Sequence, residues 1–209
     1  MTTKTAVMPL DAHARAALVR RSQLYSRMTL IYNSAEGVVA IAAGIMAGSV
    51  ALVGFGIDSV IEVVASLAAL WRLKRDADAT HRERSERMAL RVIGSSFLVL
   101  AIYVLVDAGR ALYRHEAPES TILGLGITIL SVVIMPLLAR AKRRIAVTLG
   151  SRALSADATQ TNLCAYLSAI VLVGLVVNAT LGWWWADSVA ALVMVPIIAK
   201  EGVEGLRGS

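Results

Sequence analysis

Residues 54–71 read GFGIDSVIEVVASLAALW, a mostly apolar stretch that contains two acidic side chains, Asp58 and Glu62. The two carboxylates are spaced i,i+4, so they lie on the same face of an α-helix. The stretch has about the length that an α-helix needs to cross a bilayer, roughly 20 residues. Ionisable groups in hydrocarbon are costly unless they are paired, bind an ion or line a watery cavity. The stretch therefore predicts a membrane helix that carries part of a functional site.

The composition of the whole chain is typical of a membrane protein rather than a soluble domain. Hydrophobic residues make up 57% of the 209 residues, mean hydropathy is +0.66, and the charged residues cluster between long apolar stretches. Residues 1–27 are predicted to form a cytosolic N-terminal arm, and residues 28–209 a transmembrane domain. We predict an all-α, polytopic fold with six transmembrane helices, at about 28–48, 50–71, 88–112, 121–139, 156–179 and 185–204.

The basic residues predict how these helices are oriented in the membrane. The formal net charge is +6, and 19 of the 21 Lys and Arg residues fall in the arm, the connecting segments 72–91 and 140–152, and the C-terminal tail. Only Arg110 and Arg114 belong to the other side. Because positively charged segments stay in the cytoplasm, we expect a multi-pass protein of the cell membrane with both termini cytoplasmic. The positive charge thus follows topology, and no nucleic-acid partner is expected.

A second i,i+4 pair of coordinating side chains, Gln160 and Cys164, lies within SADATQTNLCAYLSAIVLV. Counted from the basic edges of their helices, Glu62 and Asp58 are 10 and 14 residues deep, while Gln160 and Cys164 are 8 and 12 residues deep. At about 1.5 Å per residue these depths overlap. If the two helices are neighbours, Asp58 meets Cys164 and Glu62 meets Gln160.

Four donors on two antiparallel helices can converge on one divalent transition-metal ion with tetrahedral geometry. Two carboxylates, an amide oxygen and a thiolate favour zinc or cadmium, with cobalt and nickel behind. We expect the ion to be a transported substrate, with Zn²⁺ as the first candidate, and we expect no cofactor. Two simpler interpretations stay open. The polar pairs form only a structural hydrogen-bond network, or Cys164, the single cysteine of the chain, is an apolar filler.

Two further acidic residues are candidates for a role beside this site. Asp157 shares a helix face with Gln160 and Cys164 and lies nearer the cytosol. Three roles stay open for it: a ligand for the incoming ion, a proton acceptor, or only a helix cap. Glu36 lies within IYNSAEGVVAI of the first predicted span, where a carboxylate indicates function by default. All three histidines fall outside the predicted spans, so none is available to the site.

The chain resembles the cation diffusion facilitator family, also called cation efflux proteins, over roughly residues 25–207. The resemblance rests on DSVIE, on SADATQTNLCAYLSAI and on the six-span layout with cytosolic ends. In that family the second span carries D-x-x-x-D or H-x-x-x-D, and the fifth typically reads A-D-x-x-H-x-x-x-D. Asp58 and Glu62 fall on the first pair, whereas Gln160 and Cys164 stand where members usually have His and Asp.

The resemblance implies a six-helix membrane domain that forms homodimers and exchanges metal ions for protons. The chain is expected to be a short form without the family's cytosolic C-terminal metal-binding domain. With no His at the site, proton coupling would have to use Asp58, Glu62 or Asp157. The expected function is export of zinc, or of cadmium, cobalt or nickel, from the cytosol.

The alternative function is a membrane metal sensor or accessory subunit that has the same fold but does not transport. The altered pair Gln160 and Cys164 is consistent with this alternative. An enzyme is not expected, because no Ser-His-Asp set, HExxH motif or phosphate-binding loop occurs.

Overall fold

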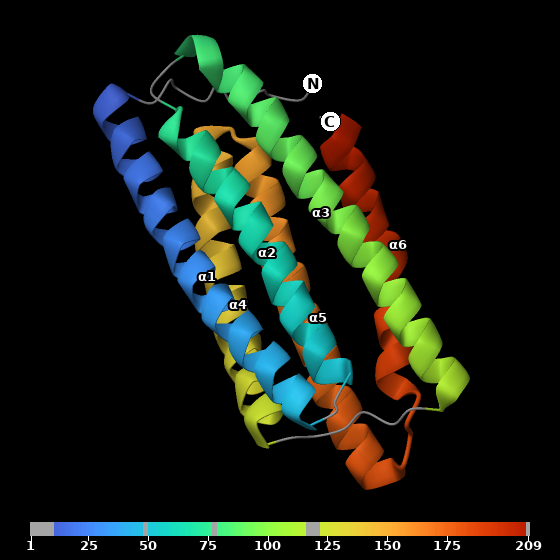
Figure 1. The fold of residues 1–209 in the computed structure, drawn as a ribbon. Helices are drawn as coiled ribbons and strands as arrows, with labels where there is room; N and C mark the ends of the chain where they lie inside the picture. Colours follow the sequence, from blue (N-terminus) through green and yellow to red (C-terminus); the bar gives the residue numbers. More distant parts are fainter. Residues whose placement is uncertain (1–10, 48–49, 77–78, 116–121, 208–209) are drawn as a thin grey trace, which may run out of the picture.

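A computed structural model describes residues 11–47, 50–76, 79–115 and 122–207 of the chain. They form α1 (Ala12–Ala47), α2 (Val50–Lys74), α3 (Ala79–Arg114), α4 (Ile122–Leu149), α5 (Arg152–Leu181) and α6 (Ala186–Arg207). The helices lie alongside one another in a single bundle (Figure 1), and no strand occurs in the described residues. The prediction of an all-α fold is confirmed.

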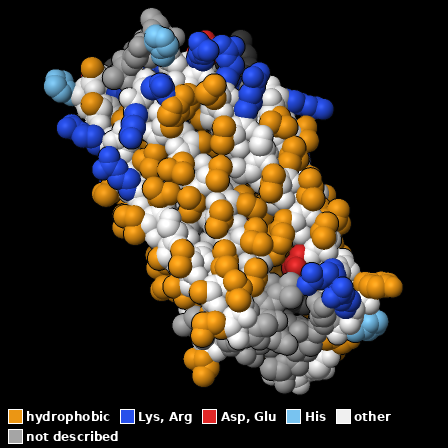
Figure 2. Space-filling view, in the orientation of Figure 1, with side chains coloured by type: hydrophobic (Ala, Val, Ile, Leu, Met, Phe, Trp, Pro, Cys, Tyr) orange, Lys and Arg blue, Asp and Glu red, His pale blue; other side chains and the backbone are white. Residues whose placement is uncertain are grey.

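Three stretches of the described helices are long and apolar enough to cross a membrane, namely Val53–Lys74, His81–Arg114 and Leu125–Leu149. The face of the bundle seen in Figure 2 is covered with hydrophobic side chains between its two ends. Large apolar side chains such as Ile31 and Val193 are exposed, while many polar ones are buried. This arrangement suits a protein surrounded by lipid, whose polar groups must be satisfied internally. That all six helices span the membrane stays a prediction.

The helices extend beyond the predicted spans. Helix α1 already begins at Ala12, so the described part of the predicted arm is continuous with the first span. The predicted connecting segments 72–91 and 140–152 are mostly helical, because α3 begins at Ala79 and α4 continues to Leu149. A run of charged residues marks where a helix leaves the apolar layer, but Arg, Lys and Glu are good helix formers and do not end it. Residues 1–10 of the arm lie outside the described residues.

Helices α2 and α5 are packed against each other near the middle of the bundle. Helix α2 also contacts α1 and α3, and α5 also contacts α3, α4 and α6. A hydrophobic cluster that includes Ile61, Phe97 and Leu163 joins α2, α3 and α5. The condition set by the sequence, that the helices carrying the two polar pairs are neighbours, is therefore met.

The turn between α4 and α5 determines how these two helices face each other. Gly150 has a φ of 64°, which glycine adopts without the steric cost that other residues meet. Its N–H bonds to the carbonyl of Val147 (3.1 Å), and the N–H of Ser151 bonds to the carbonyl of Ala146 (3.0 Å), as in a Schellman motif. Ser151 then caps α5 by accepting a hydrogen bond from the Leu154 N–H (3.2 Å). The chain thus reverses direction within two residues.

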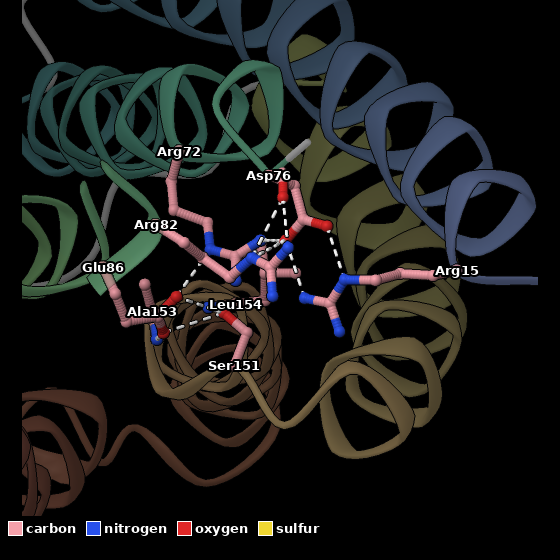
Figure 3. Close-up of polar contacts among 8 residues, drawn as sticks. All are labelled: Arg15, Arg72, Asp76, Arg82, Glu86, Ser151, Ala153 and Leu154. Atoms are coloured by element: carbon pink, nitrogen blue, oxygen red, sulfur yellow. Dashed lines mark hydrogen bonds and ion pairs between the residues drawn. The ribbon is translucent and has the colours of Figure 1, made fainter. Parts of the chain in front are cut away.

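Most Lys and Arg side chains visible in Figure 2 gather at the end of the bundle where α1 begins and α6 finishes, here called the basic end. A network of ion pairs ties several helices together there (Figure 3). Asp76, just after α2, accepts two hydrogen bonds from Arg15 of α1 (2.7 and 2.9 Å) and one from Arg72. Glu86 of α3 accepts hydrogen bonds from Arg72 and from the hydroxyl of Ser151 (2.8 Å). The network thus joins α1, α2, α3 and the start of α5.

The charge of Asp76 is stabilised by its partners. Burial acts to raise the pKa of Asp76, but the hydrogen bond from Arg15 and the positive charge of Arg72 outweigh it. The pKa of Asp76 therefore lies below its usual range, and the same hydrogen bond raises the pKa of Arg15. Asp76 is 3% exposed and Arg72 2% exposed, so this part of the segment 72–91 is an interior contact rather than a solvated surface.

Candidate metal site

The two acidic residues of α2 point into the interior of the bundle. Asp58 is 6% exposed and Glu62 is 0% exposed, and the i,i+4 spacing places both on the side of α2 that faces α5. The small residues Ser59, Ala65 and Ser66 are also buried on α2. Small residues let neighbouring helices approach closely in a membrane, so side chains of α1 and α5 can reach the two carboxylates.

Cys164 of α5 lies against Asp58, within hydrogen-bonding reach. It is 1% exposed and also close enough to Glu62 and Glu36 to interact electrostatically with both. The structure therefore brings together the pair that matched depths predicted. A thiol that lies against one carboxyl group and within electrostatic range of two more is an unusual environment for an apolar filler, and a thiol would supply a soft donor among oxygen donors.

Gln160 and Glu62 are buried without hydrogen-bond partners. Gln160 is 1% exposed, and neither its amide oxygen nor its amide nitrogen has a partner in the structure. Glu62 is 0% exposed; Thr161 and Cys164 lie close to its carboxyl group, but neither oxygen forms a hydrogen bond of good geometry. The predicted contact between these two side chains is therefore not a hydrogen bond. Buried polar groups without partners are rare and carry a desolvation cost. Water or an ion would relieve that cost here.

The four predicted ligands share one region without closing around a point. Among the described residues, no group of three or more His, Cys, Asp and Glu side chains could hold a metal ion in the arrangement seen. Asp58, Glu62, Gln160 and Cys164 are therefore four buried polar side chains on the neighbouring helices α2 and α5, not a finished coordination shell. Their role as ligands stays a prediction.

Glu36 of α1 belongs to the same region. It is 5% exposed and accepts hydrogen bonds from Ser59 of α2 (2.8 Å) and from Tyr32 (3.0 Å). Its charge also interacts with those of Asp58 and Glu62. A third helix thus contributes a carboxylate next to the two from α2, as expected for a buried Glu with a functional role.

Asp157 lies deeper in α5 than a helix cap. The helix begins at Arg152 and is capped by Ser151, which excludes the capping interpretation of Asp157. Asp157 is 1% exposed, forms an ion pair with Lys142 of α4 at 3.0 Å, and accepts a hydrogen bond from Ser66 of α2 at 3.3 Å. Along α5 it lies between the basic end and Gln160.

Lys142 was not singled out by the sequence, where it is one of several basic residues in the segment 140–152. In the structure it is 2% exposed and donates a hydrogen bond to the hydroxyl of Thr161 (3.0 Å) in addition to its ion pair with Asp157. The sequence feature that could have indicated this pair is the depth of each residue, counted from the turn at Gly150. Lys142 precedes Gly150 by eight residues and Asp157 follows it by seven, which places both at similar levels on antiparallel helices.

The buried face of α1 carries a polar stripe, of which only Glu36 was predicted from the sequence. Its members recur every three or four residues, all of them 0–5% exposed, and they are Ser22, Ser26, Thr29, Asn33 and Glu36. The hydroxyl of Ser26 and both amide atoms of Asn33 have no hydrogen-bond partner. The spacing is that of a helix face, so the sequence contained this signal. The stripe connects the basic end with the region around Asp58.

Together these features define a helical bundle with candidate membrane spans, whose interior holds several buried carboxylates and other polar side chains. The chain belongs to the cation efflux family, because the cation efflux transmembrane domain matches residues 27–209. The resemblance drawn from the two motifs is therefore confirmed.

Several relatives are similar along most of the chain. An uncharacterized transporter of Methanocaldococcus jannaschii is 27% identical over 179 residues, which cover 83% of this chain and 63% of the relative. Transmembrane protein 163 of Xenopus laevis is 28% identical, covering 93% and 69%, respectively. The cation-efflux pump FieF of Shewanella oneidensis is 23% identical, covering 90% and 63%. The chain thus spans about two thirds of the length of these relatives.

Proposed function

We propose that this chain exports a divalent transition-metal ion, zinc or else cadmium, cobalt or nickel, from the cytosol in exchange for protons. The observation that carries the proposal is the meeting of Asp58 of α2 with Cys164 of α5 in the buried interior. It places a hard and a soft donor from two helices side by side, next to the unpartnered groups of Glu62 and Gln160. The relative from Shewanella oneidensis is named a cation-efflux pump, which supports efflux as the direction.

Metal binding would complete the coordination shell that the side chains leave open. A divalent ion attracts the carboxylates of Asp58 and Glu62 and displaces the proton of the Cys164 thiol, since metals bind the thiolate. Gln160 then supplies a neutral oxygen. A shift of α2 and α5 relative to each other would draw these donors together, and such a shift is the movement that alternating access needs. Protons released on binding, and taken up again after metal leaves, provide the exchange.

The ion would enter from the basic end and leave at the opposite one. The positive-inside rule places the basic end in the cytoplasm together with both termini. Asp157 and the polar stripe of α1, which ends at Glu36, lie between that end and Asp58. Glu36 and Asp157 therefore serve the incoming ion or the proton rather than the final coordination shell. The exposed apolar side chains would face lipid and, in a homodimer, a second copy of the chain.

The test is metal flux by the purified protein in liposomes that contain a metal-sensitive dye and a pH-sensitive dye. Wild-type protein is expected to move zinc with an opposing movement of protons. Asp58→Asn removes one negative ligand and is expected to reduce flux by about 100-fold, the upper end of what loss of a mere outer-shell partner costs at a metal site. Glu204→Gln, a change at an exposed position of α6, is the matched control and should transport normally.

Two outcomes decide against the proposal. Folded wild-type protein that moves none of zinc, cadmium, cobalt, nickel and manganese would favour the sensor or accessory role instead. Flux that is the same in Asp58→Asn and wild-type protein would show that transport does not use this site.

A further inference from the structure

Lys142 of α4 is a buried cation that lies beside Asp157 of α5, one turn of helix from the candidate ligand Gln160. Its ammonium group lies 3.0 Å from Oδ2 of Asp157 and 3.0 Å from the hydroxyl of Thr161. Both charged side chains of the pair are 2% exposed. On the other side of Asp157, Ser66 of α2 donates to Oδ1 (3.3 Å). The ammonium group is thus held at the interface of α2, α4 and α5.

The charge of Lys142 also interacts with that of Glu62. Glu62 interacts electrostatically with both Lys142 and Asp157, yet neither of its own oxygens accepts a hydrogen bond. Four buried carboxylates gather in this part of the bundle, on Glu36, Asp58, Glu62 and Asp157. Among the described residues, Lys142 is the single cation in an ion pair with any of the four. It therefore offsets negative charge that a divalent ion would otherwise neutralise.

We propose that Lys142 is a tethered cation that competes with the incoming metal ion for the carboxylates of Asp157 and Glu62; this inference rests on the proposed metal transport. Without metal, the ammonium group holds Asp157 and offsets the charge of Glu62. A divalent ion carries twice the charge and repels the ammonium group as it binds. When the metal leaves outward, Lys142 returns to the carboxylates and disfavours rebinding from the same side.

The chemistry of lysine suits this role. Its ammonium group is a compact point charge on a flexible four-carbon stem, so it can withdraw and return without movement of the helix. Residues 140, 143 and 144 of α4 are arginines with exposed positions on the helix, so the buried position differs from its basic neighbours in both burial and residue type. A positioning residue of this kind should affect metal affinity and turnover in opposite directions.

The test compares Lys142→Gln with wild-type protein in zinc-flux and equilibrium zinc-binding measurements. Without the competing charge, zinc is expected to bind about tenfold more tightly. A unit charge within roughly 10 Å of the ion changes the binding constant by at least that factor at an effective dielectric constant near 20. The apparent KM is expected to fall to a similar extent, and the maximal rate to fall because release is slower. Lys142→Arg keeps the charge and is expected to retain most of the wild-type KM.

Lys200→Gln is the control, because the Lys200 side chain is 73% exposed on α6 and forms an ion pair with Glu204, one turn further along the same helix. If Lys142→Gln does not fold, as judged by its elution profile and thermal transition, then Lys142→Gln with Asp157→Asn is compared with Asp157→Asn alone. The neutral pair leaves no unpaired buried charge between these two positions. Tighter zinc binding with Lys142 removed is again the expected result, because Glu62 is still relieved of its competitor.

The outcomes separate this inference from the proposed function. Suppose that wild-type protein transports zinc, and that Lys142→Gln binds zinc no more tightly and has the same or a higher KM. Lys142 is then only structural and the inference is wrong. If wild-type protein binds zinc without transporting it, the transport proposal fails, while tighter binding by Lys142→Gln still supports the tethered cation. Absence of zinc binding in both proteins overturns both.

Discussion

The hydroxyl of Ser59 on α2 donates a 2.8 Å hydrogen bond to Oε2 of Glu36 on α1. Ser59 directly follows Asp58 in the chain, so this bond ties the buried carboxylate of α1 to the candidate metal site. The other oxygen of Glu36 accepts a hydrogen bond from Tyr32, one turn earlier on α1 (3.0 Å). A shift of α1 past α2 would have to break the Ser59 bond, so α1 is expected to move with the site.

Replacement of Ser59 by alanine is expected to destabilise the protein by about 1–3 kcal/mol, because the buried carboxyl group of Glu36 loses a partner. Zinc flux is expected to fall as well, since Glu36 is no longer held beside Asp58. Both are measurable, by unfolding in mixed micelles and by liposome flux. Ser96→Ala is the control, because the Ser96 hydroxyl bonds only to the carbonyl of Val92 on its own helix. Equal stability of the two variants would contradict the argument.

Replacement of Cys164 by serine is expected to change metal preference more than overall activity. A hydroxyl is a harder and less acidic donor than a thiol, so cadmium, which favours soft ligands, should lose more than manganese. We expect the ratio of cadmium to manganese flux to fall at least about tenfold, as 1.4 kcal/mol of lost preference would produce. Competition between the two ions in liposomes measures this ratio. An unchanged ratio would support the filler interpretation of Cys164.

The polar stripe on α1 is expected to be accessible to water-soluble reagents from the basic end. In a Cys164→Ser background, the chain has no other cysteine, so Asn33→Cys can be probed with a membrane-impermeant thiol reagent. The buried, unpartnered Asn33 should react when the reagent is on the side of the basic end, and zinc should slow the reaction. Ile31→Cys, 71% exposed on the outer surface of the same helix, should react little because it faces lipid. Equal reactivity at both positions would argue against a water-filled path.

Asp76 is expected to contribute stability that depends on pH. Because its folded pKa lies below the unfolded value, of about 3.9, its contribution is present above that pH and is lost as the pH falls through the folded pKa. Asp76→Asn should lower the unfolding free energy at pH 7 by about 3 kcal/mol, the low end for a broken buried ion pair, since Arg72 keeps Glu86. Below pH 4 the difference between the two proteins should shrink. A difference that persists at low pH would contradict the role of the charge.

The packing of α3 against α6 is expected to tolerate no side chain at Gly94. A methyl group there would lie 2.8 Å from the carbonyl oxygen of Gly202 and 2.9 Å from the backbone of Gly205, and backbone atoms cannot move aside easily. Gly94→Ala should therefore cost about 1–3 kcal/mol, as overpacking does. Gly109→Ala on the same helix meets nothing within 4 Å and should stabilise by up to about 1 kcal/mol through helix propensity. Thermal unfolding of the two variants in detergent compares them directly.

The helical fold and its family were predictable from the sequence because both depend on local patterns. Apolar runs of helical length and the spacing of Asp58 and Glu62 depend only on neighbouring residues, and the family match over residues 27–209 agrees with them. The ends of the helices were predicted less well. The charged segment after Lys74 continues as α3 from Ala79, because leaving the apolar layer does not end a helix.

The candidate site was partly predictable for a geometric reason. Depth in the membrane can be counted along a helix, so Asp58 and Cys164 could be matched before their helices were known to touch. The rotation of each helix about its axis cannot be counted in the same way, so the sequence predicted that Glu62 meets Gln160 without specifying their contact, and the structure shows no hydrogen bond between them. For the same reason the sequence did not show that Lys142 is buried, since its basic neighbours on α4 remain at the surface.

The sequence by itself determined that the chain forms apolar helices, which residues interrupt them with polar groups, and how deep each polar group lies. Depth along the helices also matched Asp58 with Cys164, whereas only the tertiary structure decided that Glu36 pairs with Ser59 and Asp157 with Lys142. The physical reason is that helix formation depends on local hydrogen bonds and side-chain propensities, whereas pairing depends on which faces of separate helices are turned toward each other. In an apolar surrounding, buried charges favour those pairings that compensate them.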